Sequence, residues 1–215
     1  MLHTNHRPAE TKETVFIVDD DEAVRDSLQW LIETEGYQVQ TFEDPMHFLD
    51  QLQWPQTCVL LLDIRMPKLS GLEVQKALNN KGIAVPIIFI TGHGDVTLAV
   101  ETMKSGAVDF LEKPFDEAKI KELIQVHMEK ARELVKEYKV DEQINRLFSK
   151  LTTRELQVLE RIVSGRLNKQ IADDLSISIK TVEAHRANIM DKLQVTTVAD
   201  LLKIALRKSP ELAQN

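Results

Sequence analysis

The sequence has little of what would place a chain outside the ordinary globular proteins. It contains one cysteine, seven glycines and seven prolines in 215 residues, so a disulfide scaffold, a collagen-like repeat and a low-complexity chain are excluded. The longest apolar runs are only strand-sized, at Val59–Leu62 and Ile87–Ile90, and the polar segment Met1–Thr14 has no signal-peptide core. We therefore expect a cytoplasmic protein without a membrane span. Cys58 begins an apolar run and is expected to be a buried thiol.

The charge is unevenly distributed along the chain. The formal net charge of -7 argues against nucleic acid as a partner, but residues 1–125 carry 11 basic and 21 acidic residues, 126–145 carry 4 and 5, and 146–215 carry 12 and 8. These counts give -10, -1 and +4. An acidic domain joined to a basic one that tolerates a polyanion explains the asymmetry, and two solvated surfaces of opposite charge explain it equally well.

The acidic part alternates short apolar runs with helical patterns. The runs are Val15–Val18, Tyr37–Phe42, Val59–Leu62, Pro86–Ile90 and Ala107–Leu111. The helical patterns are Glu22–Glu35, Pro45–Leu52, Gly71–Leu78, Asp95–Lys104 and the segment from Asp116 onward. This alternation predicts an α/β fold with a doubly wound, five-stranded parallel sheet. Five strands fit the flavodoxin-like order 2-1-3-4-5, which binds ligands at the carboxyl ends of its strands.

Polar residues follow four of the predicted strands. They are Asp19, Asp20 and Asp21 after the first, Asp63 after the third, Thr91 after the fourth and Lys113 after the fifth. Carboxylates that converge on one point repel each other unless a proton or a cation lies between them, and hard oxygen ligands suit Mg²⁺. A lysine and a hydroxyl at the same edge would complete a receptacle for a phosphoryl group. A single aspartate here is more often a helix cap, and Asp21 is the expected N-cap.

Residues 14–125 resemble the receiver domain of a two-component response regulator. The motifs that carry the resemblance are Val-Asp-Asp-Asp at 18–21, Asp-Ile-Arg-Met-Pro at 63–67, Thr-Gly-His-Gly at 91–94 and Glu-Lys-Pro-Phe at 112–115. The resemblance implies that Asp63 accepts a phosphoryl group from a sensor histidine kinase, with Thr91 and Lys113 contacting the phosphoryl oxygens. It also implies Mg²⁺ or Mn²⁺ as the cofactor. Asp20, Asp63 and the backbone carbonyl of Arg65 would hold the ion, and Asp19 would act directly or through water.

The same resemblance assigns further roles around this site. Phe110 corresponds to the aromatic switch residue, although a plain core aromatic is an equally good interpretation. The Lys113-Pro114 bond is expected to be cis, and Val100, Lys104 and Asp109 match dimer-interface positions. His93 has no nucleophile that it obviously serves, so we expect a loop or surface role for it.

Residues 126–147 are predicted to form a helical linker. The pattern that begins at Asp116 continues to Leu147 without glycine or proline, and its apolar positions are Ile120, Ile124, Met128, Ala131, Val135 and Tyr138. Their spacing is close to a heptad stripe, which is typical of a helix that pairs in a dimer. In the alternative, the part from Ile120 to about Met128 covers the sheet and the remainder is a solvated linker.

The basic part, residues 148–215, shows the pattern of a small all-α domain. Thr152 and Glu155 form a capping box that opens a helix ending near Gly165. A helix at Asn168–Leu175, a tight turn and a helix capped by Ser178 form a helix-turn-helix, and a fourth helix follows from about Thr197 to Leu206.

Residues 149–206 resemble the four-helix DNA-binding domain of the LuxR/FixJ type. The matching residues are Leu151-Thr152, Arg154-Glu155, Val158-Leu159, Gly165, Asn168-Lys169, Ile171-Ala172, Thr181-Val182, His185 and Lys192-Leu193. The candidate DNA contacts are Lys169, Lys180, Thr181, Glu183, His185 and Arg186. Two alternatives stay open, since His185 can pack inward and Asn188 can lie too far from the groove floor.

Together the two regions resemble a FixJ-type response regulator and predict a phosphorylation-activated transcription regulator. The partners implied are the cognate histidine kinase, a second copy of the chain in a homodimer formed on phosphorylation, promoter DNA with an inverted repeat, and RNA polymerase, with activation favoured over repression. A phosphatase is the rival enzyme, but Arg65 stands where such enzymes carry a second acid. We therefore expect no enzyme activity beyond slow self-dephosphorylation. A DNA binder with a vestigial receiver is a second rival, which the complete acidic site opposes.

Overall fold

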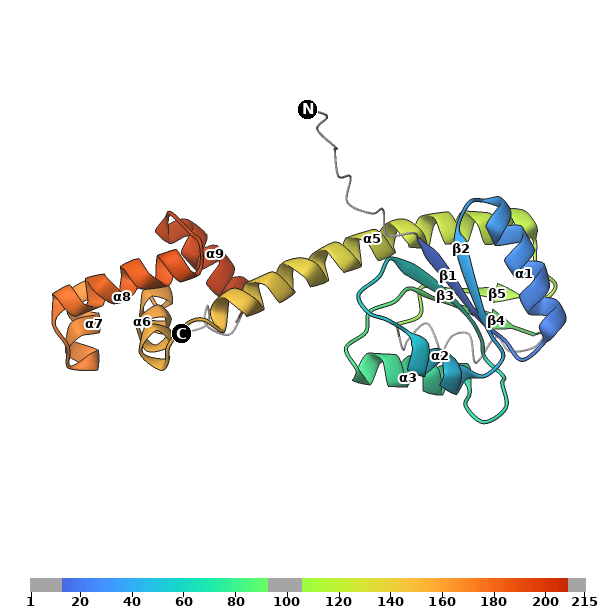
Figure 1. The fold of residues 1–215 in the computed structure, drawn as a ribbon, viewed down its shortest axis with the longest axis horizontal. Coiled ribbons are helices and arrows are strands. Elements are labelled where there is room, and N and C mark those ends of the chain that lie inside the picture. The colour runs from blue at the N-terminus through green and yellow to red at the C-terminus, as the bar shows by residue number, and fades with distance from the viewer. Residues whose placement is uncertain (1–12, 93–105, 209–215) are drawn as a thin grey trace, which may run out of the picture. The chain divides into compact units, whose positions relative to one another are not determined.

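The computed structural model describes residues 13–92 and 106–208, and Figure 1 shows its ribbon. The chain packs into two compact units that divide between Glu137 and Tyr138, which we call the N-terminal unit and the C-terminal unit. Within the described ranges, no helix is long and apolar enough to cross a membrane.

The N-terminal unit is built on a five-stranded sheet. Its strands are β1 (Thr14–Val18), β2 (Gln38–Phe42), β3 (Cys58–Asp63), β4 (Ile87–Thr91) and β5 (Asp109–Glu112). All neighbours pair in parallel in the order β2-β1-β3-β4-β5, which confirms the predicted fold class. The register aligns Val18 with Leu62, and Asp63 with Ile90. The carboxyl ends of the strands therefore meet at one edge of the sheet.

Helices cover both faces of this sheet (Figure 1). Apolar side chains from α1 (Glu22–Thr34) and α5 (Glu117–Phe148) share a core cluster with one face of the strands, whereas α2 (Pro45–Gln51) and α3 (Gly71–Asn80) pack on the other. Successive strand residues alternate between the two clusters, as β-strand geometry requires. The helix expected at Asp95–Lys104 lies outside the described residues.

Local sequence signals explain where these helices begin. The Asp21 carboxylate accepts the backbone N–H of Ala23 at 2.9 Å, which confirms Asp21 as the N-cap of α1. Ser70 and Glu73 form a capping box at the start of α3. Cys58 is buried at the start of β3, and loss of solvation raises the pKa of its thiol to about 12, as expected of an unreactive thiol.

Helix α5 is continuous over 32 residues. Ile120, Ile124, Met128 and Ala131 are buried in the core cluster on the sheet, so these members of the apolar stripe cover the sheet and are not available to pair with a second helix. Beyond the sheet the chain stays helical to Phe148. The last residues of α5 pack on the core of the C-terminal unit.

The C-terminal unit is helical. It contains α6 (Thr153–Val163), α7 (Asn168–Leu175), α8 (Ile179–Lys192) and α9 (Val198–Lys208) around one apolar cluster. The predicted capping box of Thr152 and Glu155 is present at α6. Between α7 and α8 the chain turns sharply at Ser176, whose φ is 53°, and the Ser178 hydroxyl accepts the backbone N–H of Thr181 at 3.0 Å. Helices α7 and α8 thus form the helix-turn-helix.

Candidate functional site

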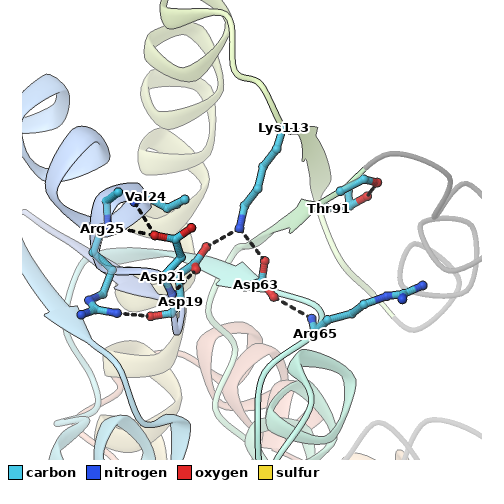
Figure 2. A network of polar contacts seen from close by, with 10 residues as sticks. Asp19, Asp21, Val24, Arg25, Asp63, Arg65, Thr91 and Lys113 are labelled. Carbon is cyan, nitrogen blue, oxygen red and sulfur yellow. Dashed lines mark hydrogen bonds and ion pairs between the residues drawn. The ribbon is translucent and has the colours of Figure 1, made fainter.

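The carboxyl edge of the sheet brings together three of the predicted site residues. Asp63 is the last residue of β3, Asp19 directly follows β1, and Lys113 directly follows β5. The Lys113 Nζ atom donates to Asp19 Oδ2 at 2.8 Å and to Asp63 Oδ1 at 2.9 Å (Figure 2). One ammonium group therefore lies between two buried carboxylates from different strands.

Backbone donors fix the second oxygen of each carboxylate. Asp19 Oδ1 accepts the N–H of Asp21 at 2.9 Å, and Asp63 Oδ2 accepts the N–H of Arg65 at 2.7 Å. Both carboxylates are thus held on two sides. A contact that the sequence interpretation missed also supports this loop, because the Arg25 guanidinium donates to the backbone carbonyl of Asp19 at 2.7 Å (Figure 2).

A second missed residue is Gly71, the first residue of α3. A Cβ atom at this position would lie 2.4 Å from the Asp63 carbonyl oxygen and 2.9 Å from Cε1 of Phe89. Only glycine lets the helix approach the phosphoacceptor candidate this closely. The available signal was a glycine directly after a capping serine, shortly beyond the Asp63 motif.

Burial governs the electrostatics of the pair. Loss of solvation raises the pKa of Asp63, and the negative charge of Asp19 adds to the rise, while the hydrogen bond from Lys113 offsets part of it. Burial alone would lower the pKa of Lys113, but its hydrogen bonds to Asp19 and Asp63 outweigh that effect and raise it. The lysine therefore stays charged between carboxylates that it does not fully neutralise.

Two predicted site residues lie outside the contact of Lys113 with Asp19 and Asp63. Asp20 is exposed at the rim, and its side chain has no hydrogen-bond or ion-pair partner among the described residues. The Thr91 hydroxyl donates to the Gly92 carbonyl at 2.9 Å instead of pointing to Asp63 (Figure 2).

The donor set fits a hard divalent cation chemically. Within residues 13–92 and 106–208 no three His, Cys, Asp or Glu side chains are gathered closely enough to hold a metal ion. However, Asp19, Asp20 and Asp63 carry three negative charges against the single charge of Lys113, and all their ligand atoms are oxygens. The remaining two charges and the oxygen donors match Mg²⁺ or Mn²⁺.

The predicted switch and dimer residues lie on β5 and beyond the described ranges. Phe110 is 46% exposed, so it is not a core aromatic in this structure. Asp109 accepts the backbone N–H of Phe110, and its other oxygen lies 3.7 Å from Nε2 of the buried His127. Val100, Lys104 and His93 lie outside the described residues. The Lys113-Pro114 bond is cis, as predicted.

In the C-terminal unit, internal contacts hold several of the basic residues. Lys192 Nζ pairs with the buried Glu155 at 2.7 Å, Arg154 donates to the Leu175 carbonyl at 2.6 Å, and Arg161 lies 3.5 Å from Asp174. Other basic side chains have no partner in the described part of the chain. Of these, Lys169, Lys180 and Arg186 lie on the helix-turn-helix and Arg166 lies just before it, whereas Lys150 and Lys203 lie elsewhere in the unit. Arg166 was not among the predicted contacts.

Burial divides the predicted DNA contacts into two groups. Lys169, Lys180, Thr181 and Glu183 are exposed, whereas His185 and Arg186 are half-buried. Asn188 is exposed as well. The half-buried residues lie on the flank of α8 and not at the centre of its outward surface, which favours phosphate contact over base contact for Arg186.

Comparison with known proteins matches both units. Residues 15–125 match the response regulator receiver domain, and residues 149–205 match bacterial regulatory proteins of the luxR family. Transcriptional regulatory protein FixJ of Bradyrhizobium diazoefficiens is 41% identical over 92% of this chain and 96% of its own, and FixJ of Rhizobium meliloti is 44% identical over 91% and 96%. The structure of the response regulator StyR is similar with a TM-score of 0.77 and 42% identity, covering 91% of this chain and 99% of StyR.

Proposed function

Because the chain belongs to the response regulators that join a receiver domain to a LuxR-type DNA-binding domain, we propose that Asp63 accepts a phosphoryl group from a sensor histidine kinase. This modification controls how the C-terminal unit binds promoter DNA. The observation that carries the proposal is the Lys113 ammonium shared between Asp19 and Asp63 at the carboxyl edge of the sheet.

The contacts of Asp63 suit a nucleophilic carboxylate. The Arg65 N–H orients one oxygen, and the hydrogen bond from Lys113 offsets part of the rise in the pKa of Asp63 that burial causes. In the transfer, a bond forms between an Asp63 oxygen and phosphorus while the bond from phosphorus to the kinase histidine nitrogen breaks, and its electron pair stays on that nitrogen. When bound by Asp19, Asp20, Asp63 and the Arg65 carbonyl, Mg²⁺ or Mn²⁺ supplies positive charge to the phosphoryl oxygens.

In this proposal, two side chains respond to the new group. The Thr91 hydroxyl exchanges the Gly92 carbonyl for a phosphoryl oxygen, and the exposed Phe110 side chain turns inward into the space that this movement leaves. Phosphorylation thereby favours one of two arrangements of the surface around β5. That surface, with Val100, Lys104 and Asp109, forms the homodimer.

The dimer presents two helix-turn-helix motifs to an inverted repeat in promoter DNA, with one α8 in each half-site. The unpaired basic residues on the motif support this part, because they supply positive charge to the phosphate backbone. Once bound, the dimer contacts RNA polymerase and raises transcription. The resemblance to FixJ-type regulators favours activation over repression.

The site does not favour a hydrolase. Arg65, two residues after Asp63, offers its backbone N–H to Asp63, and no acidic side chain stands at that position. A water molecule attacking an aspartyl phosphate would lack a general base there. Loss of the phosphoryl group is therefore a slow self-dephosphorylation that resets the switch.

One experiment tests this function. The full chain is incubated with acetyl phosphate and Mg²⁺, and covalent phosphate, sedimentation and promoter-DNA binding are measured for the wild type and for Asp63→Asn. We expect the wild type to gain phosphate, dimerise and bind DNA more tightly, and the variant to do none of these.

Asp50→Asn is the matched control, because Asp50 is exposed on α2 and has no partner in the described part of the chain. It should behave as the wild type does. A variant at position 63 that matched the wild type in all three measurements would contradict the switch. Equal DNA binding with and without phosphate would instead favour the vestigial-receiver alternative.

A further inference from the structure

The outward face of α8 carries two alanines at its centre. Four exposed residues follow each other at helical spacings of four, three and four residues. They are Lys180, Ala184, Ala187 and Asp191. Val182 and Ile189, on the opposite face, are fully buried. Residues at this spacing lie along one line of the helix surface, so this line is the part of α8 that points farthest from the core of the unit.

Only the first half of this line can approach DNA closely. Asp191 lies at the carboxyl end of α8, where its negative charge and the negative end of the helix dipole would both be repelled by phosphates. Lys180 lies in the first turn and has no partner in the described part of the chain. The amino-terminal half of α8, from Ile179 to Ala187, is therefore the part that enters the groove.

Alanine limits what this half can recognise. The side chains of Ala184 and Ala187 offer one methyl group each, with no hydrogen-bond donor or acceptor, and their small size lets the helix backbone come close to the base edges. Among the base edges in the major groove, the apolar feature is the C5-methyl group of thymine. Ile179, which is 45% exposed at the start of α8, extends the apolar surface.

The side chains beside the alanines can form hydrogen bonds with bases. Glu183 is exposed and unpaired within the described ranges, and a carboxylate accepts a hydrogen bond from the N4 amino group of cytosine. Lys180 can donate to O6 and N7 of guanine. The half-buried Arg186 lies on the flank nearer Val182, which suits it to the backbone of a bound duplex and not to the base edges.

We propose that Ala184 and Ala187 contact thymine methyl groups in the major groove, so that each half-site of the operator has thymines at its centre with a C·G pair beside them. The proposal rests on the proposed function, since it requires that the C-terminal unit binds DNA. It adds the chemistry by which α8 selects its sequence.

The test begins with a selection of duplexes from a random DNA library by the full chain, treated with acetyl phosphate and Mg²⁺. In the selected duplex, each thymine is then replaced singly by deoxyuridine, which lacks only the C5-methyl group. We expect the replacement at a contacted position to weaken binding about fourfold, the value for one buried methyl-sized group. Replacement outside the half-sites should leave the affinity unchanged.

Ala184→Gly and Ala187→Gly identify the partner of each methyl group. At one position, each variant should bind the thymine duplex and the uracil duplex with equal affinity. At the other positions it should keep the wild-type ratio of the two affinities. The ratio of the two affinities is the readout, because a general loss of helix stability lowers both affinities alike. Ala199→Gly, at an exposed alanine of α9, carries the same backbone change and should leave every ratio as in the wild type.

The outcomes separate this proposal from the function on which it rests. If the selection yields a sequence that uracil does not weaken at any half-site position, the methyl contacts are wrong and DNA binding stands. If both glycine variants keep the wild-type ratio of thymine-duplex to uracil-duplex affinity at every position, the two alanines are not the contacts. If no duplex is enriched at all, the proposed function fails and this inference fails with it.

Discussion

Two lysine–carboxylate contacts, one in each unit, differ in their effect on the acid. Lys113 lies 2.9 Å from Asp63 and Lys192 lies 2.7 Å from Glu155, and both carboxylates are buried. Burial and the charge of Asp19 nevertheless raise the pKa of Asp63. Burial also acts to raise the pKa of Glu155, but the hydrogen bonds from Lys192 and Thr152 outweigh it and lower the pKa.

The difference lies in how many acids share one lysine. Lys113 serves two buried carboxylates, so the N-terminal unit keeps uncompensated negative charge at the sheet edge. Lys192 serves one carboxylate, which also caps α6, so the C-terminal unit contains a neutral link between α6 and α8. A buried ion pair thus has a structural role where the lysine neutralises all the carboxylates it contacts. Where negative charge is left over, the ion pair is a candidate reactive site.

The largest expected effect comes from a substitution that displaces Asp63. Gly71→Ala places a Cβ atom 2.4 Å from the Asp63 carbonyl oxygen, so we expect the N-terminal unit to lose about 3 kcal/mol of unfolding free energy. Phosphorylation of Asp63 should slow as well. Denaturant unfolding of the full chain measures the loss. Gly92→Ala is the control, because among the described residues no atom beyond its chain neighbours lies within 4 Å of its added Cβ, and equal unfolding of the two variants would contradict the close approach.

Removing the charge of Glu155 tests the ion pair of the C-terminal unit, in which one lysine serves one carboxylate. Glu155→Gln keeps the shape of the side chain but removes its charge, and we expect the C-terminal unit to lose about 2 kcal/mol, since Lys192 is partly exposed and solvent screens the pair. The lowered pKa of Glu155 contributes stability above its ordinary value of 4.5, and this contribution disappears as the pH falls through the folded-state pKa. The variant and the wild type should therefore converge in acid. Glu160→Gln, exposed on the same helix, should unfold as the wild type does.

Removing the charge of Asp63, which Lys113 does not fully neutralise, should raise the unfolding free energy instead of lowering it. Asp63→Asn relieves a carboxylate whose ionised form is disfavoured in the folded state, so we expect it to stabilise the N-terminal unit by about 1 kcal/mol near neutral pH while abolishing phosphorylation. A raised pKa means that the wild type gains stability as the pH falls through the folded-state value. The gap should therefore close below 3.8, the ordinary pKa of the group. Unfolding curves at several pH values check this, and a destabilised variant at pH 7 would contradict it.

The smallest expected effect concerns the unpaired charges of the C-terminal unit. Lys169→Gln should weaken DNA binding about threefold on every sequence and reduce the slope of log affinity against log salt by about 0.9, the value for one phosphate contact. Lys203→Gln, at an exposed lysine of α9, should leave that slope unchanged. A change in sequence preference on Lys169→Gln would show base contact instead.

The sequence predicts those features that depend on neighbouring residues. Strands β1, β3 and β4 are short apolar runs buried on both faces, and Asp21 and Thr152 cap helices through residues two or three positions away. Five strands alternating with helices fit the observed strand order, and Asp63 and Lys113 could be placed together because each lies at the carboxyl end of a parallel strand.

The remaining features depend on how the segments pack against each other. No sequence motif indicates the bond from Arg25 to the Asp19 carbonyl, and a glycine after a capping serine was the only signal for the close approach of Gly71. The apolar stripe of α5 suited a dimer seam and a sheet cover equally, and the structure packs its first part, from Ile120 to Ala131, on the sheet. Likewise, the charge count of the basic region could not separate the lysines that pair internally from those that face solvent.

The position of Lys113 also affects the rate of the proposed transfer. Its side chain is already fixed by two carboxylates, at 2.8 and 2.9 Å, so the rotamer entropy of a lysine, about 2 kcal/mol, is lost during folding and not in the transition state. In the proposed transfer, the ammonium is therefore already beside Asp63 when negative charge develops on the arriving phosphoryl group. A charge arrangement that makes the resting fold less stable would in this way favour the transition state.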